Sequence, residues 1–285
     1  MQSFKALAIA LAVALVSLLG FAAVPSPAFA NTPQLKPSEV YWNYQAETGP
    51  AYWADLDSQF KTCASGQTQS PIDLTAAEPT DLLNPEFHYL PVPLNLLNNG
   101  HTVKVPYAPG SYFTLEGKRY DLLQFHFHSP SEHAINGESQ SAELHLVHQS
   151  DEGELAVVAV LLKLSDEGGS DEGGRDKGGS DEDASNGRAI AYTALSQNLP
   201  AQAGDKVRTG KTINAQSLLP TQTTTYRYSG SLTTPPCSES VTWLVMSQPV
   251  DLPGSQLAQY QKLLNHNNRP LQKLNRRAVQ MDISA

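Results

Sequence analysis

Three histidines with strand-like spacing stand out in the chain because imidazole nitrogens bind metal ions and carry protons. His126 and His128 are separated by one residue, and His145 follows seventeen residues after His128. Alternate side chains of an extended strand share a face, so His126 and His128 point the same way. An antiparallel partner strand that carries His145 would bring three neutral nitrogens together. With a fourth position left open, this pattern predicts a catalytic zinc site.

Two polar residues precede these histidines at matching positions. Gln124 lies two residues before His126, and Glu143 lies two residues before His145. Each is placed to accept a hydrogen bond from the ring nitrogen that does not bind the metal, which fixes the tautomer and raises the basicity of the ligand. A His-x-His pair by itself is more often an ordinary surface or core pair. The spacing alone therefore leaves a metal site and a structural cluster as alternatives.

Four further residues could complete a site that activates water. Thr233 and Thr234 belong to a Thr-Thr-Pro-Pro run, whose prolines favour a stiff, extended loop, and Glu132 follows the histidine pair closely. A carboxylate that accepts from a threonine hydroxyl would orient the nucleophile beside the metal. His101, in an Asn-Asn-Gly-His loop, suits removal of the proton that water activation releases. Without this context, His101 would be an exposed loop histidine and Thr-Thr-Pro-Pro an ordinary turn.

Strand signals dominate the elements that must position these residues. Short apolar or alternating runs are separated by Gly, Pro and Asn turns, and Leu123, Phe125 and Phe127 are expected to face the core. The predicted strands are Phe87–Tyr89, Leu94–Asn98, Thr102–Val105, Tyr112–Leu115, Arg119–His128, Ser141–His148, Leu155–Leu164, Thr225–Ser229 and Val241–Met246. Leu155–Leu164 is nearly continuously apolar, as expected for a strand covered on both faces. The pattern predicts one α+β domain, mainly β, around a large sheet.

Helix signals are few. They predict helices over Ile190–Asn198 and over Ser255–Asn265, the second opened by Gly254-Ser255 as a cap. A repetitive acidic Gly/Ser/Asp/Glu segment at about 165–187 lacks apolar residues and is predicted to be a mobile loop insertion that activity does not need. Calcium binding is the weaker interpretation, because the spacing fits neither an EF-hand nor a nine-residue repeat.

The first thirty residues have the pattern of a secretory signal peptide. Lys5 precedes an apolar run, and Ala28-Phe29-Ala30 offers a cleavage site, so residues 31–285 form the expected mature domain. A membrane span is the competing interpretation, but the Pro25-Ser26-Pro27 break favours removal. The sequence therefore predicts an exported protein, periplasmic or extracellular, with no stable membrane insertion after cleavage.

Charge and cysteine content narrow the class further. The formal net charge of the whole chain is −9, and no basic patch with interleaved aromatic residues appears, which argues against nucleic-acid binding. The two cysteines, Cys63 and Cys237, predict a disulfide in an exported protein. The pattern leaves the oligomeric state open between a monomer and a homodimer.

Together these motifs resemble those of the α-class carbonic anhydrases, in their bacterial, exported form. The resemblance runs from Tyr41 to Arg277, and several motifs in the right order make it specific. The matching segments are Tyr41–Tyr44, Gln69–Asp73, Leu97–His101, Gln124–His128, Ser131–His133, Ala142–His148, Gly230–Pro236, Val241–Trp243 and Asn268–Pro270. It implies a central twisted, mostly antiparallel sheet with a few short peripheral helices. It also implies reversible hydration of CO2 to bicarbonate with Zn²⁺ as cofactor.

The resemblance also assigns roles to individual residues. It implies that His126, His128 and His145 bind zinc, that Gln124 and Glu143 support them, and that Glu132 and Thr233 orient the hydroxide. His101 matches the proton shuttle, Tyr44 and Asn99 match polar groups that order its waters, and Cys63 and Cys237 match a disulfide. The substrate pocket is implied at Thr233, Thr234, Val147, Val157, Leu232, Val241 and Trp243.

Two residues and one segment depart from the family pattern. Ser129 and Lys104 occupy positions where many members carry tryptophan and a neutral polar residue, and the acidic insertion has no family counterpart. Two rival functions follow from the same motifs. A non-catalytic binding protein on this fold is one, although such relatives lose a zinc histidine and all three are present here. A zinc esterase is the other, because the same hydroxide attacks esters.

Overall fold

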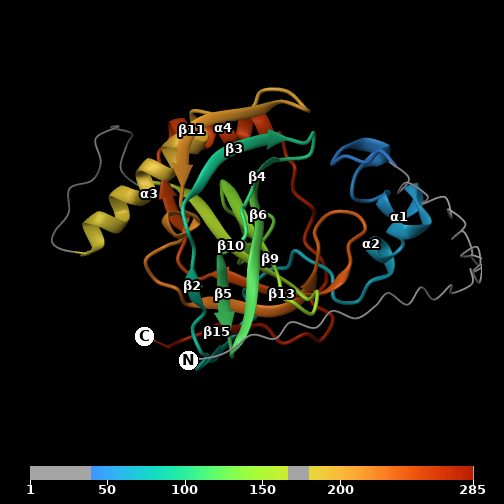
Figure 1. Ribbon diagram of the computed structural model, residues 1–285. Coiled ribbons are helices and arrows are strands. Elements are labelled where there is room, and N and C mark those ends of the chain that lie inside the picture. Colours follow the sequence, from blue (N-terminus) through green and yellow to red (C-terminus); the bar gives the residue numbers. More distant parts are fainter. Residues whose placement is uncertain (1–39, 166–179, 285) are drawn as a thin grey trace, which may run out of the picture. The chain divides into compact units, whose positions relative to one another are not determined.

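The computed structural model describes residues 40–165 and 180–284 (Figure 1). The expected signal peptide at 1–30 and most of the acidic insertion lie outside the described residues. The helices are η1 (Ala46–Thr48), α1 (Trp53–Leu56), η2 (Ser58–Phe60), α2 (Thr62–Ser65), α3 (Ser180–Ser196), η3 (Ala215–Leu218) and α4 (Gly254–Leu264). The strands are β1 (Glu78–Thr80), β2 (Glu86–His88), β3 (Val92–Asn98), β4 (Val103–Pro106), β5 (Tyr112–Leu115), β6 (Lys118–His128), β7 (Ala134–Ile135), β8 (Glu138–Ser139), β9 (Ala142–Gln149), β10 (Leu155–Leu164), β11 (Lys206–Ile213), β12 (Thr225–Ser231), β13 (Glu239–Met246), β14 (Val250–Leu252) and β15 (Gln280–Asp282).

A large twisted sheet organises the described residues (Figure 1). Thirteen strands belong to it, and its main path runs β1-β15-β12-β13-β10-β9-β6-β4-β3-β11. The pairs β1–β15, β10–β13 and β10–β14 are parallel, whereas the other pairs of this sheet are antiparallel. The predicted α+β fold around a mostly antiparallel sheet is therefore confirmed, and it places β6 and β9 side by side near the middle.

All nine predicted strands are present, with ends that differ by a few residues. The sequence missed the short edge and hairpin strands, the longer strand β11, and the short helices before residue 66. β11 lies at one edge of the main path, where most of its side chains are exposed, so its sequence has few apolar residues to mark it as a strand.

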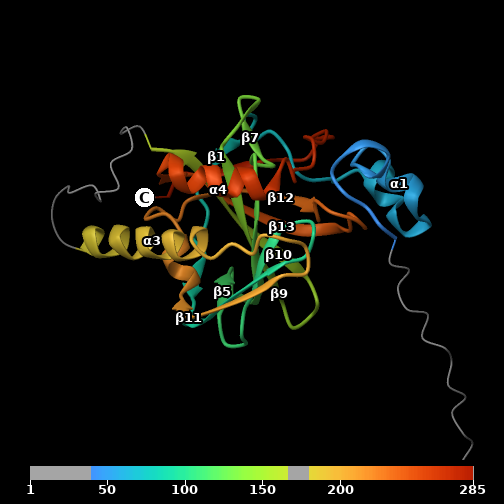
Figure 2. The same ribbon diagram turned by 90° about the horizontal axis from the view of Figure 1, so that it is seen from above.

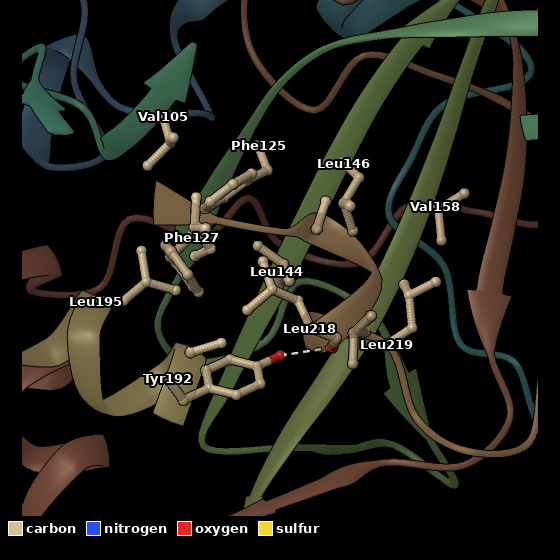
Figure 3. Packing of buried hydrophobic residues seen from close by; sticks show 14 of the residues in the cluster. Val105, Phe125, Phe127, Leu144, Leu146, Val158, Tyr192, Leu195, Leu218 and Leu219 are labelled. Atoms are coloured by element: carbon tan, nitrogen blue, oxygen red, sulfur yellow. Dashed lines mark hydrogen bonds between the residues drawn. The ribbon is translucent and has the colours of Figure 1, made fainter. Parts of the chain in front are cut away.

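The two faces of the sheet bury separate apolar clusters. One face carries a large cluster that includes Phe125, Phe127 and Leu144 and that α3 and α4 cover (Figures 2 and 3). Tyr192 of α3 is fully buried there, and its hydroxyl donates to the Leu218 main-chain oxygen at 2.9 Å. The opposite face buries a smaller cluster around Trp243. β10 contributes to both clusters, so the expectation that this strand is covered on both faces is confirmed.

A register shift within β6 corrects one expectation. The pairing of β6 with β9 shifts between Leu122 and Gln124, so the alternation of side chains changes phase at that point. Leu122 is 2% exposed and Leu123 is 43% exposed, whereas Phe125 and Phe127 are buried. The prediction that Leu123 faces the core was wrong, because the irregularity turns that residue outward.

Both predicted helices exist, but their starts differ from the prediction. α3 begins at Ser180 instead of Ile190, so residues 180–187, expected in the loop insertion, form the first part of the helix. α4 begins at Gly254 with Pro253 at its N-cap position and no side-chain cap. The expected Gly-Ser cap was therefore wrong. Figure 2 shows the two helices along the same side of the sheet.

The predicted disulfide between Cys63 and Cys237 is confirmed. It joins α2 to the loop after β12, and both cysteines pack with Trp53 in a small apolar cluster. The segment before residue 66 is therefore tied to the loop that carries Thr233 and Thr234. Among the helices in the described part of the chain, none combines the length and apolar character needed to cross a bilayer.

Candidate functional site

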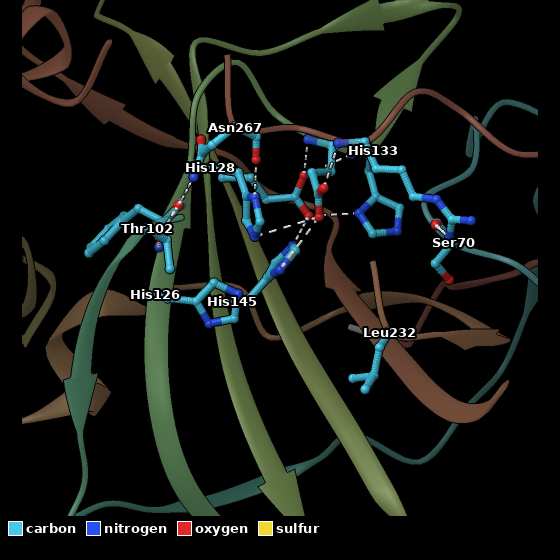
Figure 4. Close-up of polar contacts among 12 residues, drawn as sticks. Ser70, Thr102, His126, His128, His133, His145, Leu232 and Asn267 are labelled. Atoms are coloured by element: carbon cyan, nitrogen blue, oxygen red, sulfur yellow. Dashed lines mark hydrogen bonds and ion pairs between the residues drawn. The ribbon is translucent and has the colours of Figure 1, made fainter. Parts of the chain in front are cut away.

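The three histidines of the sequence pattern converge on one face of the β6–β9 pair. His126 lies directly opposite His145 in the antiparallel register, and His128 lies two residues further along β6. One ring nitrogen from each residue lies within 4.8 Å of the others. Figure 4 shows the three rings turned toward a common point. The predicted geometry follows from the alternation of side chains in two paired strands.

The nitrogens that His126 and His128 direct at this point are fixed by their outer hydrogen bonds. His126 Nδ1 lies 3.0 Å from Gln124 Oε1, which leaves His126 Nε2 free. His128 Nδ1 donates to the main-chain oxygen of Asn267 at 2.7 Å. His128 Nε2 is buried and has no hydrogen-bond partner. Both residues therefore offer Nε2 lone pairs to the space between the rings.

Glu143 orients the third histidine, His145, through the other ring nitrogen. Its Oε1 accepts from His145 Nε2 at 2.7 Å, which leaves His145 Nδ1 directed at the other two rings. The same oxygen accepts from His133 Nδ1 at 2.6 Å, and Oε2 accepts the main-chain amides of Glu132 and His133 at 2.8 Å each. Burial raises the pKa of this carboxylate, but its contacts with His133 and His145 outweigh burial and hold the pKa well below the usual range.

The environment of the three histidines suits metal binding. Burial lowers the pKa of each, to about 4 for His128, so the neutral form that binds metals prevails at neutral pH. Three neutral imidazoles, one of them with an unpartnered buried nitrogen, match the donor set of a catalytic zinc ion. The residues present therefore fit zinc.

Glu132 lies against the same point and is fully buried. The main-chain amide of Arg269 donates to its Oε1 at 2.8 Å. Its Oε2 lies 3.6 Å from His128 Nε2 and 3.9 Å from His145 Nδ1. Burial raises the pKa of Glu132 to about 7, although the Thr233 hydroxyl and the Arg269 amide both favour its ionised form. A divalent cation beside it would favour the carboxylate further.

The loop that carries Thr233 and Thr234 is held from several directions. Gly230 precedes it where a Cβ would collide with Ser70 Oγ and lie 2.7 Å from the Trp243 ring, so only glycine fits. The main-chain amide of Cys237 donates to the Thr234 oxygen at 2.8 Å. These contacts leave Thr233 buried beside Glu132 and Thr234 half-buried.

His101 lies apart from the three convergent rings and is half-buried. It stacks on Trp42 with 3.8 Å between ring centroids and 6° between planes. Burial lowers the pKa of His101. Its main-chain oxygen accepts from Asn267 Nδ2 at 3.0 Å, which links this loop to the residue that orients His128.

The two remaining polar candidates, Tyr44 and Asn99, both precede His101 in the sequence. Tyr44 packs against Trp53, and burial and the charge of Glu132 raise its pKa well above the usual value. Asn99 is exposed, and its side-chain oxygen accepts the main-chain amides of His101 and Thr102 at 3.0 and 2.8 Å. The carbonyl end of Asn99 therefore shapes its own loop.

Comparison with known proteins places this site in a family. The model of the eukaryotic-type carbonic anhydrases matches residues 48–283. The chain belongs to this carbonic anhydrase family. A carbonic anhydrase of Nostoc sp. is 39% identical over 261 residues, which cover 90% of this chain and 89% of that protein. One from Klebsiella pneumoniae is 36% identical over 266 residues, which cover 92% and 96%.

A solved structure agrees with the sequence comparison. The α-carbonic anhydrase from Thermovibrio ammonificans, in complex with the inhibitor sulfanilamide, superimposes with a TM-score of 0.75 at 36% identity. The superposition covers 85% of this chain and 99% of that one. The family is enzymatic, and its general reaction is the hydration of CO2.

The apolar residues expected for a carbonic anhydrase substrate wall lie together beside the three histidines. They pack in or against the smaller core cluster, and the Trp243 ring centroid lies 4.9 Å from that of His145. These residues are Val147, Val157, Leu232, Val241 and Trp243. The three buried ones are Val157, Val241 and Trp243, whereas Val147 and Leu232 are half-buried.

Sequence reasoning missed several residues that hold this carbonic anhydrase site. Asn267 accepts from His128 through its main-chain oxygen, and its side chain bonds the main chain at His101, Phe127 and Ser129. The motif Asn268–Pro270 was noticed next to it, but a main-chain acceptor leaves no residue-type signal. A second missed set extends from Glu143: the Tyr228 hydroxyl lies 2.7 Å from His133 Nε2 and 2.8 Å from Ser70 Oγ.

Proposed function

We propose that this chain catalyses the reversible hydration of CO2 to bicarbonate and a proton, with zinc held by His126, His128 and His145. The observation that carries the proposal is the convergence of three neutral ring nitrogens whose other nitrogens are all engaged by acceptors. Zinc at such a site supplies a hydroxide nucleophile at neutral pH by lowering the pKa of water to about 7.

Glu132 and Thr233 orient the nucleophile. With Oε1 occupied by the Arg269 amide, Glu132 has Oε2 available to accept the Thr233 hydroxyl proton. The Thr233 oxygen can then only accept from the nucleophile, which aims a lone pair of the nucleophile at the substrate. The disulfide and the buried loop contacts keep Thr233 in this position.

The apolar wall holds the substrate. CO2 carries no charge, so Val147, Leu232 and their buried neighbours can bind it without a strong polar contact. Thr234 is half-buried next to Thr233 and would contact the substrate. CO2 would therefore bind against the apolar wall, and the Glu132–Thr233 pair would orient the nucleophile that attacks it.

His101 removes the proton. Its half-buried ring lies in a loop joined through Asn267 to His128, and its lowered pKa favours release of the proton to buffer near neutral pH. Tyr44, which is half-buried, and Asn99, which is exposed, would order the waters that connect His101 to the metal site.

The direct test is stopped-flow CO2 hydration by the zinc-loaded protein, with and without a chelator. We expect activity far above buffer that chelation removes and zinc restores. We expect His145→Ala to lose both bound zinc and activity. This result would show that the activity depends on the metal site and does not come from a contaminating enzyme. Inhibition by sulfanilamide, which the Thermovibrio relative binds, should follow. A fully zinc-loaded protein without hydration activity would leave a binding function as the better account.

We also propose that residues 1–30 are removed on export and that residues 31–285 work outside the cytosol. The Cys63–Cys237 disulfide supports this compartment, because such bonds persist in oxidising surroundings. Intact-mass measurement of protein secreted by a bacterial host tests the proposal. A mass that includes the first thirty residues would contradict it.

A further inference from the structure

Lys104 of β4 faces the proposed metal site from the neighbouring strand. It lies directly opposite His126 in the antiparallel β4–β6 register and opposite Leu97 in the β3–β4 register. Directly opposite residues of paired strands share a face. The flanking Val103 and Val105 are buried in the core of the other face, so Lys104 projects on the side of the three histidines.

The charge of Lys104 lies on the strand next to the three histidines, directly opposite His126. None of the ion pairs among the described residues involves Lys104, although the surface lysines Lys118 and Lys163 each pair with a carboxylate. The side chain is half-buried, so water screens its charge incompletely.

Beyond the register shift in β6, the strands next to Lys104 carry no acidic side chain on this face, and Asp121, which precedes the shift, pairs with Arg119. Site-facing positions on β3 are Asn95 and Leu97, and those on β6 beyond the register shift are Gln124, His126 and His128. On β11, Lys206 and Arg208 pair with Leu97 and Asn95 and so add two exposed cations to the same face. The acidic Glu132 and Glu143 lie deeper, and both are engaged by main-chain amides. Lys104 is thus the half-buried cation of a positive row that leads to the histidines, in a chain of net charge −9.

We propose that Lys104 is a specificity-determining residue that strengthens the binding of small anions, bicarbonate among them, at the metal site. This inference rests on the proposed function, because bicarbonate is the anionic partner of that reaction. CO2 is uncharged and gains no net Coulomb attraction from Lys104, whereas bicarbonate gains one. Lys104 therefore biases the pocket toward retention of the anion, and it does so without touching the reacting atoms.

The test measures anion affinity separately from turnover. Cobalt(II) replaces zinc, and its visible absorption is titrated with thiocyanate and with bicarbonate at pH 6, where hydroxide competes little. We expect Lys104→Gln to raise both dissociation constants by roughly three- to tenfold, as expected for one partly screened charge within several ångströms. Lys104→Arg, which keeps the charge, should stay within about twofold of the unmodified protein.

Matched controls separate charge from fold. Lys262→Gln removes the same charge from an exposed position on α4, which packs on the other face of the sheet, and should leave both constants within about twofold. Lys104→Asn provides a second neutral variant, and an unchanged anion-free cobalt spectrum reports an intact site. The difference between Lys104→Gln and the unmodified protein should narrow as ionic strength rises.

Two results would overturn the inference. One is a thiocyanate constant in a correctly loaded Lys104→Gln or Lys104→Asn protein that stays within twofold of the unmodified protein. The other is an equal loss of affinity in Lys104→Arg, because geometry and not charge would then be responsible. The proposed function has its own test, and it fails if the zinc-loaded protein does not hydrate CO2. In that case the cobalt titrations would still test the role of Lys104, because they measure anion binding and not turnover.

Discussion

The main-chain amide of Arg269 donates to Oε1 of Glu132 at 2.8 Å, across 137 residues of sequence. Arg269 is itself buried, and its guanidinium donates to the main-chain oxygens of Ser70 and Cys63. This contact fixes which oxygen of Glu132 faces the histidines. The orientation of the carboxylate is therefore set by a distant segment of the chain.

Replacing Glu132 by Gln should lower kcat/KM for CO2 hydration by about a hundredfold, the scale expected when a reacting group is misaligned. The amide can still accept from the Arg269 amide, but its nitrogen would donate toward Thr233 and reverse the polarity of that hydroxyl. Stopped-flow kinetics with zinc content in parallel provide the measurement. Thr233→Ser, which keeps a hydroxyl, is the matched control and should lose far less. A fully active Glu132→Gln protein would remove the carboxylate from the mechanism.

Replacing His101 by Ala should lower kcat in dilute buffer on the order of ten- to hundredfold and change kcat/KM much less, because only proton removal is affected. Imidazole buffer should restore kcat by carrying the proton instead. Trp42→Phe keeps an aromatic surface for the stacked ring and should retain most of the activity. Equal losses in kcat and kcat/KM that imidazole fails to rescue would exclude the shuttle role.

Replacing Glu143 by Gln should weaken zinc binding by roughly ten- to hundredfold, because His145 and His133 would lose a charged acceptor. Competition with a chromophoric chelator measures the affinity directly. Glu239→Gln removes a carboxylate that bonds Thr68 and Gln69 away from the histidines and is the control. Unchanged zinc affinity in Glu143→Gln would mean that the ligand is held by packing alone.

His148 should make the protein less stable in acid. Burial lowers its pKa to about 3 in the folded state, whereas an unfolded histidine titrates near its usual 6.5. Between these values the unfolded chain binds a proton that the folded chain does not, so stability falls as the pH drops below 6.5. From pH 7 to pH 5 this one group should cost about 2 kcal/mol.

Urea unfolding of the metal-free protein at several pH values tests this prediction. His148→Gln should flatten the difference in unfolding free energy between pH 7 and pH 5, because the other histidines titrate alike in both proteins. His88→Gln, at an exposed position, should leave the slope unchanged. A difference between pH 7 and pH 5 in His148→Gln that is as large as in the unmodified protein would contradict the assignment.

Removing the disulfide should destabilise the fold by up to about 5 kcal/mol, because it closes a loop with a sequence separation of 174. The double variant Cys63→Ser, Cys237→Ser and the reduced unmodified protein should show similar losses in urea unfolding. Comparing the two losses of stability distinguishes the effect of breaking the covalent bond from the effect of replacing the sulfur atoms. Stability that is insensitive to reductant would show that packing around Trp53 suffices.

The sequence predicted the histidine cluster well because alternation is a local property. His126 and His128 share a face wherever that strand lies, and only the pairing with His145 had to be supplied by the fold. The strands with strong apolar patterns were found for the same reason. The sequence predicted fewer of the residues that orient the histidines from outside the cluster. Asn267 acts on His128 through a main-chain oxygen, which every residue type possesses.

Other parts depend on the environment more than on residue type. β11 was missed because an edge strand buries few side chains. Polar residues such as Lys206 and Arg208 are typical of loops and gave no strand signal. The start of α3 was misplaced because residues 180–187 lack apolar alternation, whereas Tyr192 and the helix end bury against the sheet. The exposure of Leu123 required the β6–β9 register, which one strand alone does not contain.

The register shift at Leu122–Gln124 has a practical meaning for anyone who edits this chain. Before it, Tyr120 and Leu122 are buried in the core, and after it the even-numbered positions belong to the histidines. The strand β6 thus consists of two pieces: even-numbered residues face the core before the shift, and odd-numbered residues face the core after it. The first piece carries none of the three histidines, so substitutions there leave the set of histidines unchanged. Leu123 is the extra residue, because Leu122 pairs with His148 and Gln124 with Val147, so deleting it would restore ordinary alternation and leave both pieces on their present faces.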